Sequence, residues 1–229
     1  MTRMTRVLLA FSVLAGTLSA QTTTLPPLQK GVRVQMAATD SAQPMVEADA
    51  PTAWIVSVTF DGSYYFGIDP VPRAGLLDAL TRRPRDRDQK LYIKADARAP
   101  FAAVKTVMDT AREALFESTV LLTSQPQPVT PGRPVPPTGL EVWMNAVTSE
   151  DSPVVQVVHA RHPPAAITIN RQSISAGVLT TTLDQLLAIQ KDKTVVLKAD
   201  PQLPVAQVVA VIDACHAAGA KLVLGKLEL

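Results

Sequence analysis

An internal repeat constrains the fold of this 229-residue chain more than any other feature of its sequence. Residues 93–109 align with residues 197–213 at a constant offset of 104, and eight of the seventeen aligned positions are identical. In the first copy the identical residues are Lys94, Ala95, Asp96, Pro100, Ala102, Val104, Val107 and Asp109. The copies also begin alike, with Val34-Gln35-Met36 and Val142-Trp143-Met144. Because a repeated segment identifies the folding unit, the sequence predicts two related modules.

A proline-rich stretch lies between the two copies. Residues 124–139 contain six prolines and show no apolar periodicity, which favours an extended polyproline II spacer. The predicted organisation is therefore a signal peptide or short anchor at 1–20, a first module at 31–123, a linker at 124–139 and a second module at 140–229.

Each copy carries the pattern of a small mixed sheet with two helices. The first is predicted to contain strands at 55–60, 64–66, 90–93 and 119–123, a hairpin turn at Asp61-Gly62, and helices at 76–80 and 100–115. The second is predicted to contain strands at 154–158, 166–169, 194–197 and 221–224, and helices at 183–189 and 205–215, with Gly219 as a helix cap. A strand, a helix and a further strand in this order form a βαβ unit with parallel strands. The predicted fold class is α/β (α+β).

Composition indicates a folded chain with no attraction to nucleic acid. Hydrophobic residues make up 47% of the chain and charged residues 18%, which is enough apolar material for packed cores. The net charge is +2, and two of the positive charges, Arg3 and Arg6, lie at the amino terminus. Without them the charges balance, so binding to phosphate-rich polymers is not expected.

The amino terminus has the layout of a secretory signal peptide. Arg3 and Arg6 precede an apolar run at 7–16, small and polar residues follow, and we predict cleavage after Ala20. The run is shorter than the roughly 20 residues that a spanning helix needs. Leu18 is bulkier than the residue preferred three positions before a cleavage site, so an uncleaved anchor in the inner membrane is the alternative.

Few side chains suggest chemistry. Asp96 and Asp200 follow a strand, where α/β proteins often place function, but hydrogen bonding to the local turn is the favoured interpretation. Asp109 and Asp213 are expected to face solvent. His159 and His162 could bind zinc if a third ligand converged, but Pro163-Pro164 follows them, so the pair is expected in a loop where nothing holds it in register.

The remaining candidates also favour structural roles. Cys215, the single cysteine, lies in an apolar helical pattern and is predicted to be a buried, inert thiol. His216 is expected to be solvated. Tyr64, Tyr65 and Phe66 are expected to give core contacts and one surface aromatic, since alternate strand residues face opposite sides. No nucleophile elbow, phosphate loop or dinucleotide motif is present, so no catalytic, cofactor or metal site is predicted.

The repeated residues resemble the periplasmic domain of the ExbD/TolR family of biopolymer-transport proteins. The similar features are a strand ending in Ala-Asp, a helix with a Val-(Met/Ile)-Asp centre, and a closing apolar strand. In this chain they are Ile93-Lys94-Ala95-Asp96 with Val107-Met108-Asp109, and Leu197-Lys198-Ala199-Asp200 with Val211-Ile212-Asp213. The resemblance covers residues 31–123 and 140–229.

The resemblance implies a non-enzymatic protein of the periplasm or cell envelope. It implies as partners an ExbB- or TolQ-like channel subunit and a TonB- or TolA-like protein, or the cell-wall polymer. Family members commonly pair these domains, so the two copies are hypothesised to form a pseudo-dimer within one chain. The chain departs from the family plan because its first acidic residue is Asp40, whereas a proton relay needs a carboxylate within the membrane. The rival interpretation is an exported small-ligand binder or enzyme that reuses the module.

Overall fold

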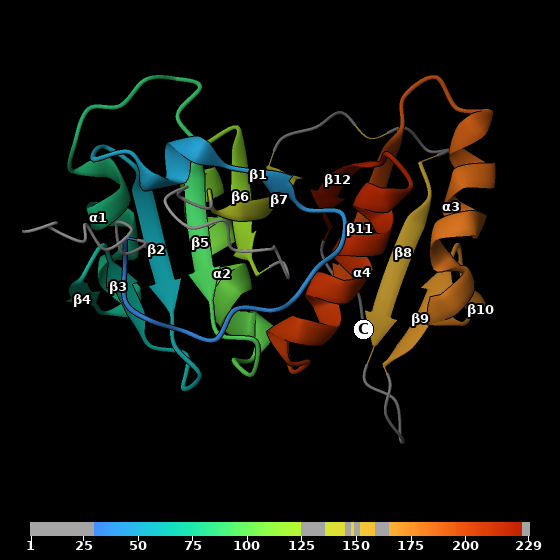
Figure 1. Cartoon of the computed structure of the whole chain (residues 1–229), viewed down its shortest axis with the longest axis horizontal. Coiled ribbons are helices and arrows are strands. Elements are labelled where there is room, and N and C mark those ends of the chain that lie inside the picture. Colours follow the sequence, from blue (N-terminus) through green and yellow to red (C-terminus); the bar gives the residue numbers. More distant parts are fainter. Residues whose placement is uncertain (1–29, 125–135, 145–147, 149–151, 159–164, 226–229) are drawn as a thin grey trace, which may run out of the picture.

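The computed structural model describes residues 30–124, 136–144, 148, 152–158 and 165–225 (Figure 1). Its strands are β1 (Gln43–Pro44), β2 (Trp54–Val58), β3 (Tyr64–Phe66), β4 (Asp69–Val71), β5 (Leu91–Ala95), β6 (Ser118–Thr123), β7 (Thr138–Trp143), β8 (Val154–Val158), β9 (Ala166–Ile169), β10 (Gln172–Ile174), β11 (Thr194–Ala199) and β12 (Lys221–Leu224). Its α-helices are α1 (Leu76–Thr81), α2 (Phe101–Glu113), α3 (Leu179–Ala188) and α4 (Val205–Ala217). Short 3-10 helices are η1 (Val46–Asp49), η2 (Arg73–Gly75) and η3 (Ala176–Val178).

All strands belong to one mixed sheet that runs across both copies of the repeat. The order is β10-β9-β8-β11-β12-β7-β6-β5-β2-β3-β4, and β1 pairs with β7 off this path. We call β1 to β6 with their helices the first module, and β7 to β12 with theirs the second. In Figure 1 α1 and α3 lie at opposite ends of the sheet, one in each module.

The predicted supersecondary units are confirmed. Strands β5 and β6 are parallel and joined by α2, and β11 and β12 are parallel and joined by α4. The hairpin of β2 and β3 turns at Gly62, whose φ of 82° is a left-handed conformation that glycine adopts readily. Helix α3 begins at Leu179, earlier than predicted, because Leu179, Leu183 and Leu187 form one buried face at four-residue steps.

The four helices pack on one face of the sheet and share a single hydrophobic core. Helix α1 packs against α2, α3 packs against α4, and α2 contacts α4. The equivalent valines Val104 and Val208 are fully buried in this core, as the helical periodicity predicted. One core cluster therefore extends through both modules.

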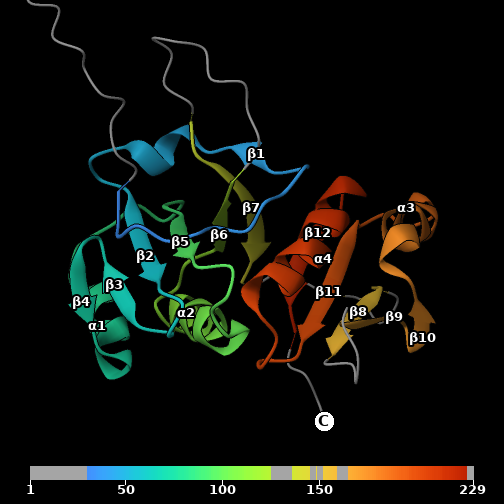
Figure 2. The same cartoon turned by 60° about the horizontal axis from the view of Figure 1, so that its bottom comes forward.

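The opposite face of the sheet, which we call the back face, is covered in the first module by residues 30–53. Met36, Met45, Ala48 and Ala53 of this covering segment pack against a second, smaller apolar cluster formed by Ile55, Tyr92, Val120 and Leu122. Figure 2 shows the covering segment and α2 on opposite sides of β5 and β6. The first module thus has three layers.

Strand β7 joins the modules. It pairs antiparallel with β6 over six residues, from Thr138 opposite Thr123 to Trp143 opposite Ser118, and it pairs in parallel with β12 at Val223. Residues Thr138 and Gly139, the last two of the proline-rich stretch, lie within this strand. Glycine is required at 139 because a Cβ atom there would come within 2.5 Å of Val120 Cγ1.

Four reciprocal backbone hydrogen bonds also connect the modules. Phe101 N donates to Leu203 O at 2.8 Å, and its repeat equivalent Val205 N donates to Ala99 O at 2.9 Å. Ala102 N likewise donates to Pro201 O, and Ala206 N to Ala97 O. These amides open α2 and α4, where the first N–H groups have no partner within their own helix. Each module therefore caps the other's helix, in the self-complementary pattern of a twofold interface.

Candidate binding groove between the two modules

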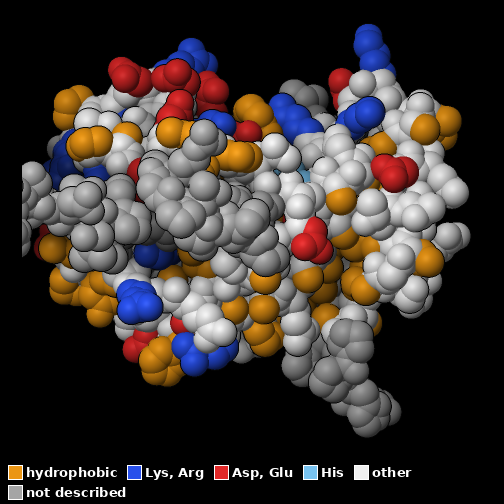
Figure 3. All heavy atoms as spheres, viewed as in Figure 1, with side chains coloured by type: hydrophobic (Ala, Val, Ile, Leu, Met, Phe, Trp, Pro, Cys, Tyr) orange, Lys and Arg blue, Asp and Glu red, His pale blue; other side chains and the backbone are white. Residues whose placement is uncertain are grey.

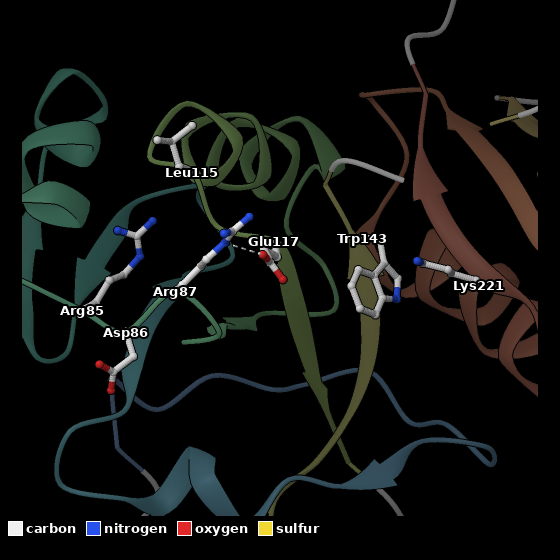
Figure 4. A pocket seen from close by; sticks show the side chains of 7 residues that line it. All are labelled: Arg85, Asp86, Arg87, Leu115, Glu117, Trp143 and Lys221. Carbon is white, nitrogen blue, oxygen red and sulfur yellow. Dashed lines mark hydrogen bonds and ion pairs between the residues drawn. The ribbon is translucent and has the colours of Figure 1, made fainter. Parts of the chain in front are cut away.

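Both modules line a groove of about 700 Å³ on the described part of the protein. The side chains that line it are Arg85, Asp86, Arg87, Leu115, Glu117, Trp143 and Lys221 (Figure 4). They come from the loop between α1 and β5, the turn between α2 and β6, the end of β7 and the start of β12. The pairing of β5 with β6, of β6 with β7 and of β7 with β12 brings these four segments together.

Trp143 and Lys221 form the wall of the groove nearest the second module. The Lys221 ammonium lies 4.0 Å from the centre of the Trp143 ring, within the range of a cation–π contact. Figure 4 shows Lys221 directed toward the ring. Lys221 is exposed and Trp143 half-buried, so an anionic group that approaches this wall meets a positive charge beside an aromatic surface.

Two arginines form the opposite wall. The guanidinium of Arg85 lies 4.1 Å from the centre of the Phe116 ring and donates to Ala114 O, while its buried Nε has no hydrogen-bond partner among the described residues. Arg87 Nε lies 3.2 Å from Glu117 Oε1, in a solvent-exposed ion pair that contributes little stability. This wall therefore presents two cations held close to the surface.

Leu115 lies between these walls in an unusual conformation. Its φ is 63°, in the left-handed region that side chains other than glycine rarely adopt, and its side chain is 75% exposed. An apolar side chain held in a costly backbone conformation and left in solvent is a feature that often marks a binding site.

The two repeated aspartates have structural partners. Asp96 is buried and accepts hydrogen bonds from Gln35 N, Arg98 N and the Arg98 guanidinium. The guanidinium, more than any other partner, lowers the pKa of Asp96 to about 2. Asp200 accepts a hydrogen bond from Gln202 N, which closes the same strand-to-helix turn. Both carboxylates therefore act in local turns.

Asp213 lies outside the buried face of α4, as predicted, but it contacts another segment of the chain, and the expectation that His216 is solvated is wrong. Asp213 accepts hydrogen bonds from Asp40 N, Ser41 N and the Ser41 hydroxyl, so it anchors the covering segment to α4. His216 Nε2 donates to Glu141 O at 2.8 Å, and burial lowers the pKa of the imidazole. Periodicity could not show these contacts, because it does not reveal which segment crosses a helix.

The equivalents of these two residues in the first module are Asp109 and Arg112. Asp109 is half-buried and forms ion pairs with Lys105 and Arg112 along α2. Arg112 also donates to Met144 O at 3.1 Å and to Leu224 O at 3.4 Å, both in the second module. Arg112 and His216 occupy equivalent repeat positions, and each contacts backbone at the junction of the modules.

The remaining candidate residues show no reactive arrangement. Cys215 is fully buried, and burial raises the pKa of its thiol to about 12, as expected for an inert cysteine. His159 and His162 lie outside the described residues. Within the described ranges, no three His, Cys, Asp or Glu side chains are grouped as metal ligands, and no helix is long and apolar enough to cross a membrane. On the face shown in Figure 3, acidic and basic side chains are interspersed.

Sequence reasoning did not identify the groove. Its residues are far apart in the chain, and only strand pairing brings the loop after α1 to the end of β7. One signal was present in the repeat, because Leu115 aligns with Gly219 at a helix end where glycine is the usual residue. A leucine at this position indicates that the side chain serves a purpose other than ending the helix.

Comparison with protein families identifies both modules. The family model described as Biopolymer transport protein ExbD/TolR matches residues 4–126 and again residues 128–224. The two matches correspond to the two halves of the sheet, and the first includes the apolar run near the amino terminus. A search of curated proteins found no match. The chain therefore belongs to the ExbD/TolR family of biopolymer transport proteins, with the family's domain present twice.

Proposed function

We propose that this protein is a non-enzymatic binding component of a biopolymer-transport assembly in the periplasm, and that its two modules act as one paired unit. Membership of the family supports a transport-associated role in the cell envelope. Family members work with ExbB- or TolQ-like and TonB- or TolA-like partners. The observation that carries the proposal is the groove, because residues of both modules line it and the pairing of the modules creates it.

The protein acts, in this proposal, through contacts rather than proton transfer. Its first acidic residue is Asp40, so residues 1–39 contain no carboxylate that could relay protons within a membrane. Energy would reach it from a channel subunit or a second family member. Accordingly, this chain alone should not restore energised uptake in cells that lack every other ExbD or TolR protein.

The proposal includes a signal peptide or short anchor at 1–20, a first module at 31–123, a linker at 124–139 whose last two residues belong to β7, and a second module at 140–229. Export with cleavage after Ala20 gives a mature chain that begins at Gln21. Mass spectrometry of the protein from the envelope fraction measures this terminus directly. If the protein in the membrane fraction began at Met1 or Met4, the amino-terminal segment would be an uncleaved anchor and the protein would not be secreted.

The groove can be tested by fluorescence. The chain contains two tryptophans, so Trp54→Phe leaves Trp143 as the only tryptophan in the protein. Titration with the periplasmic domain of a TonB- or TolA-like protein should give a saturable change in Trp143 emission. Sedimentation with purified cell-wall polymer tests the other partner class.

Variants identify the surface that binds. Lys221→Glu and Leu115→Gly should weaken binding, because they remove a cation and the exposed apolar side chain of the groove. Lys193→Glu, at an exposed position outside the groove, is the matched control. If Lys221→Glu and Leu115→Gly both bound as well as the control, the groove would not be the binding surface. Saturable binding of a small anion, without binding of a protein partner, would favour the small-ligand alternative.

A further inference from the structure

The two modules differ on the back face of the sheet. Strand register defines which residues of the two modules are equivalent: Ile55 pairs with Tyr92 and Ser57 with Lys94, whereas Val154 pairs with Val196 and Gln156 with Lys198. Lys94 and Lys198 are also identical positions of the repeat. The same surface, with the same lysine, is therefore present twice.

In the first module this surface is fully covered. Ile55, Ser57, Tyr92 and Lys94 are all at most 5% exposed. The covering segment lies so close that a Cβ atom on Gly31 would come within 2.5 Å of Ser57 Oγ. Lys94 Nζ donates to Lys30 O at 3.5 Å.

The covering segment carries acidic side chains to this surface. Glu47 Oε2 accepts a hydrogen bond from the Tyr92 hydroxyl at 3.5 Å. Burial lowers the pKa of Lys94, and the nearby Asp49 carboxylate acts in the opposite direction. The motif that covers the face is thus a short helical turn, Val46–Asp49, with small apolar residues on the sheet and carboxylates near the basic side chain.

In the second module the equivalent residues are only half-buried. Val154, Gln156, Val196 and Lys198 all retain solvent exposure. A hollow of about 490 Å³ lies here, lined by Val154, Gln156, Asn170, Arg171 and Lys198. No segment among the described residues lies over it in the way that 30–53 covers the first module.

The sequence shows a matching difference. From the Val-x-Met motif to the first strand, the first module has 17 residues, 37–53, whereas the second has nine, 145–153. The second module therefore has no counterpart for about half of the connection that supplies the cover in the first.

We infer that the back face of the second module is a docking surface for an acidic segment of a partner protein. The segment would resemble 43–53, with small apolar residues over Val154 and Val196 and carboxylates toward Lys198 and Arg171. Charge complementarity supports this occupant, because both cations border the hollow and the twin surface is covered by Glu47 and Asp49. The surface lies apart from the groove, so the inference does not depend on the proposed function.

Arg171 is held at the rim by the turn between β9 and β10. Asn170 and Arg171 have φ values of 48° and 72°, as in a tight hairpin turn with left-handed residues. Asn170 Oδ1 accepts from Val154 N at 2.9 Å, which fixes this turn to the start of β8. The Asn170 side chain, hydrogen-bonded to the backbone of Val154, thus fixes the turn that carries the second cation.

A peptide with the sequence of residues 43–53 provides the probe, titrated into the full-length protein and followed by NMR. Chemical shifts should change at Val154, Gln156, Val196 and Lys198 and not on the first module. Lys198→Glu should weaken binding on the order of tenfold, and a peptide with Glu47→Lys and Asp49→Lys should lose affinity for the wild type but regain it for Lys198→Glu. Lys193→Glu is the control and should bind like the wild type.

Lysine acetylation supplies a second measurement that does not need the peptide. Lys198 should react readily in the free protein while Lys94, its buried equivalent, remains protected, and the peptide should slow the reaction at Lys198. If Lys198 were as protected as Lys94 in the free protein, the chain itself would cover the face and the inference would be overturned. Peptide binding that Lys198→Glu and the charge-reversed peptide leave unchanged would also overturn it.

Discussion

Leu115 and Gly219 occupy the same position of the repeat with nearly the same backbone conformation, φ of 63° and 68°, although only one of them is a glycine. A left-handed conformation costs an L residue with a side chain roughly 1–2 kcal/mol relative to glycine. The backbone conformation at this position therefore costs free energy in the first module but not in the second.

Replacing Leu115 by glycine should stabilise the protein by about 1 kcal/mol, because the strain disappears and the exposed side chain contributes little burial. Gly219→Ala should destabilise by a similar amount. Urea denaturation of the two variants and the wild type measures both changes. A destabilised Leu115→Gly protein would show that the side chain packs against something in the folded state.

Charges placed in the shared core should be severely destabilising. Val104→Asp or Val208→Asp puts a carboxylate at a fully buried position, with an expected cost of several kcal/mol. Ile189→Asp makes the same kind of change at a residue that is 87% exposed and should have little effect. Thermal unfolding followed by circular dichroism compares the three, and parent-like melting of both core variants would contradict the repeat assignment.

Asp96 should make stability sensitive to acid. Its pKa is lowered to about 2 in the folded protein from 3.8, so its ionised form stabilises the fold above pH 3.8, and this stabilisation is lost as the pH falls toward 2. Asp96→Asn should cost roughly 1.5–3 kcal/mol at neutral pH, since it weakens hydrogen bonds to a buried charge. The difference in free energy of unfolding between this variant and the wild type should shrink between pH 4 and pH 2, as measured by urea titration at each pH. Asp184→Asn, on an exposed position of α3, is the control and should show no such convergence.

The pairing of the modules should permit a specific cross-link. Pro100 and Pro204 form an antiparallel bridge, for which Cα atoms lie about 4.5–5.5 Å apart, within the range of a disulfide. The double variant Pro100→Cys and Pro204→Cys should therefore oxidise to a monomer with faster mobility on a non-reducing gel. Each single variant is the control, because the other cysteine of its chain, Cys215, is buried and leaves only intermolecular bonds accessible. Dimers as the main product of the double variant would contradict pairing within one chain.

The repeat alone predicted much of the fold. Periodicity and turn residues are local properties, so they located the β2–β3 hairpin, the βαβ units and the buried faces at Val104 and Val208 without knowledge of tertiary contacts. The same locality explains the correct expectation for Cys215, whose neighbours in the helix pattern are apolar. It also explains the turn role of Asp96, whose main partner, Arg98, is two residues away.

Tertiary structure decided the rest, because those features depend on segments that are distant in sequence. His216 is hydrogen-bonded to Glu141 of β7, and Asp213 to Ser41, which is 172 positions away in the sequence. The periodicity of a helix does not predict such contacts. Sequence identity made Lys94 and Lys198 equivalent, but the path of residues 30–53 buries Lys94, whereas Lys198 is only half-buried. The sequence by itself determined two like modules, whereas tertiary contacts made them unlike: pairing through β7 created the groove, and the path of residues 30–53 covers only one of the two back faces within the described part of the chain.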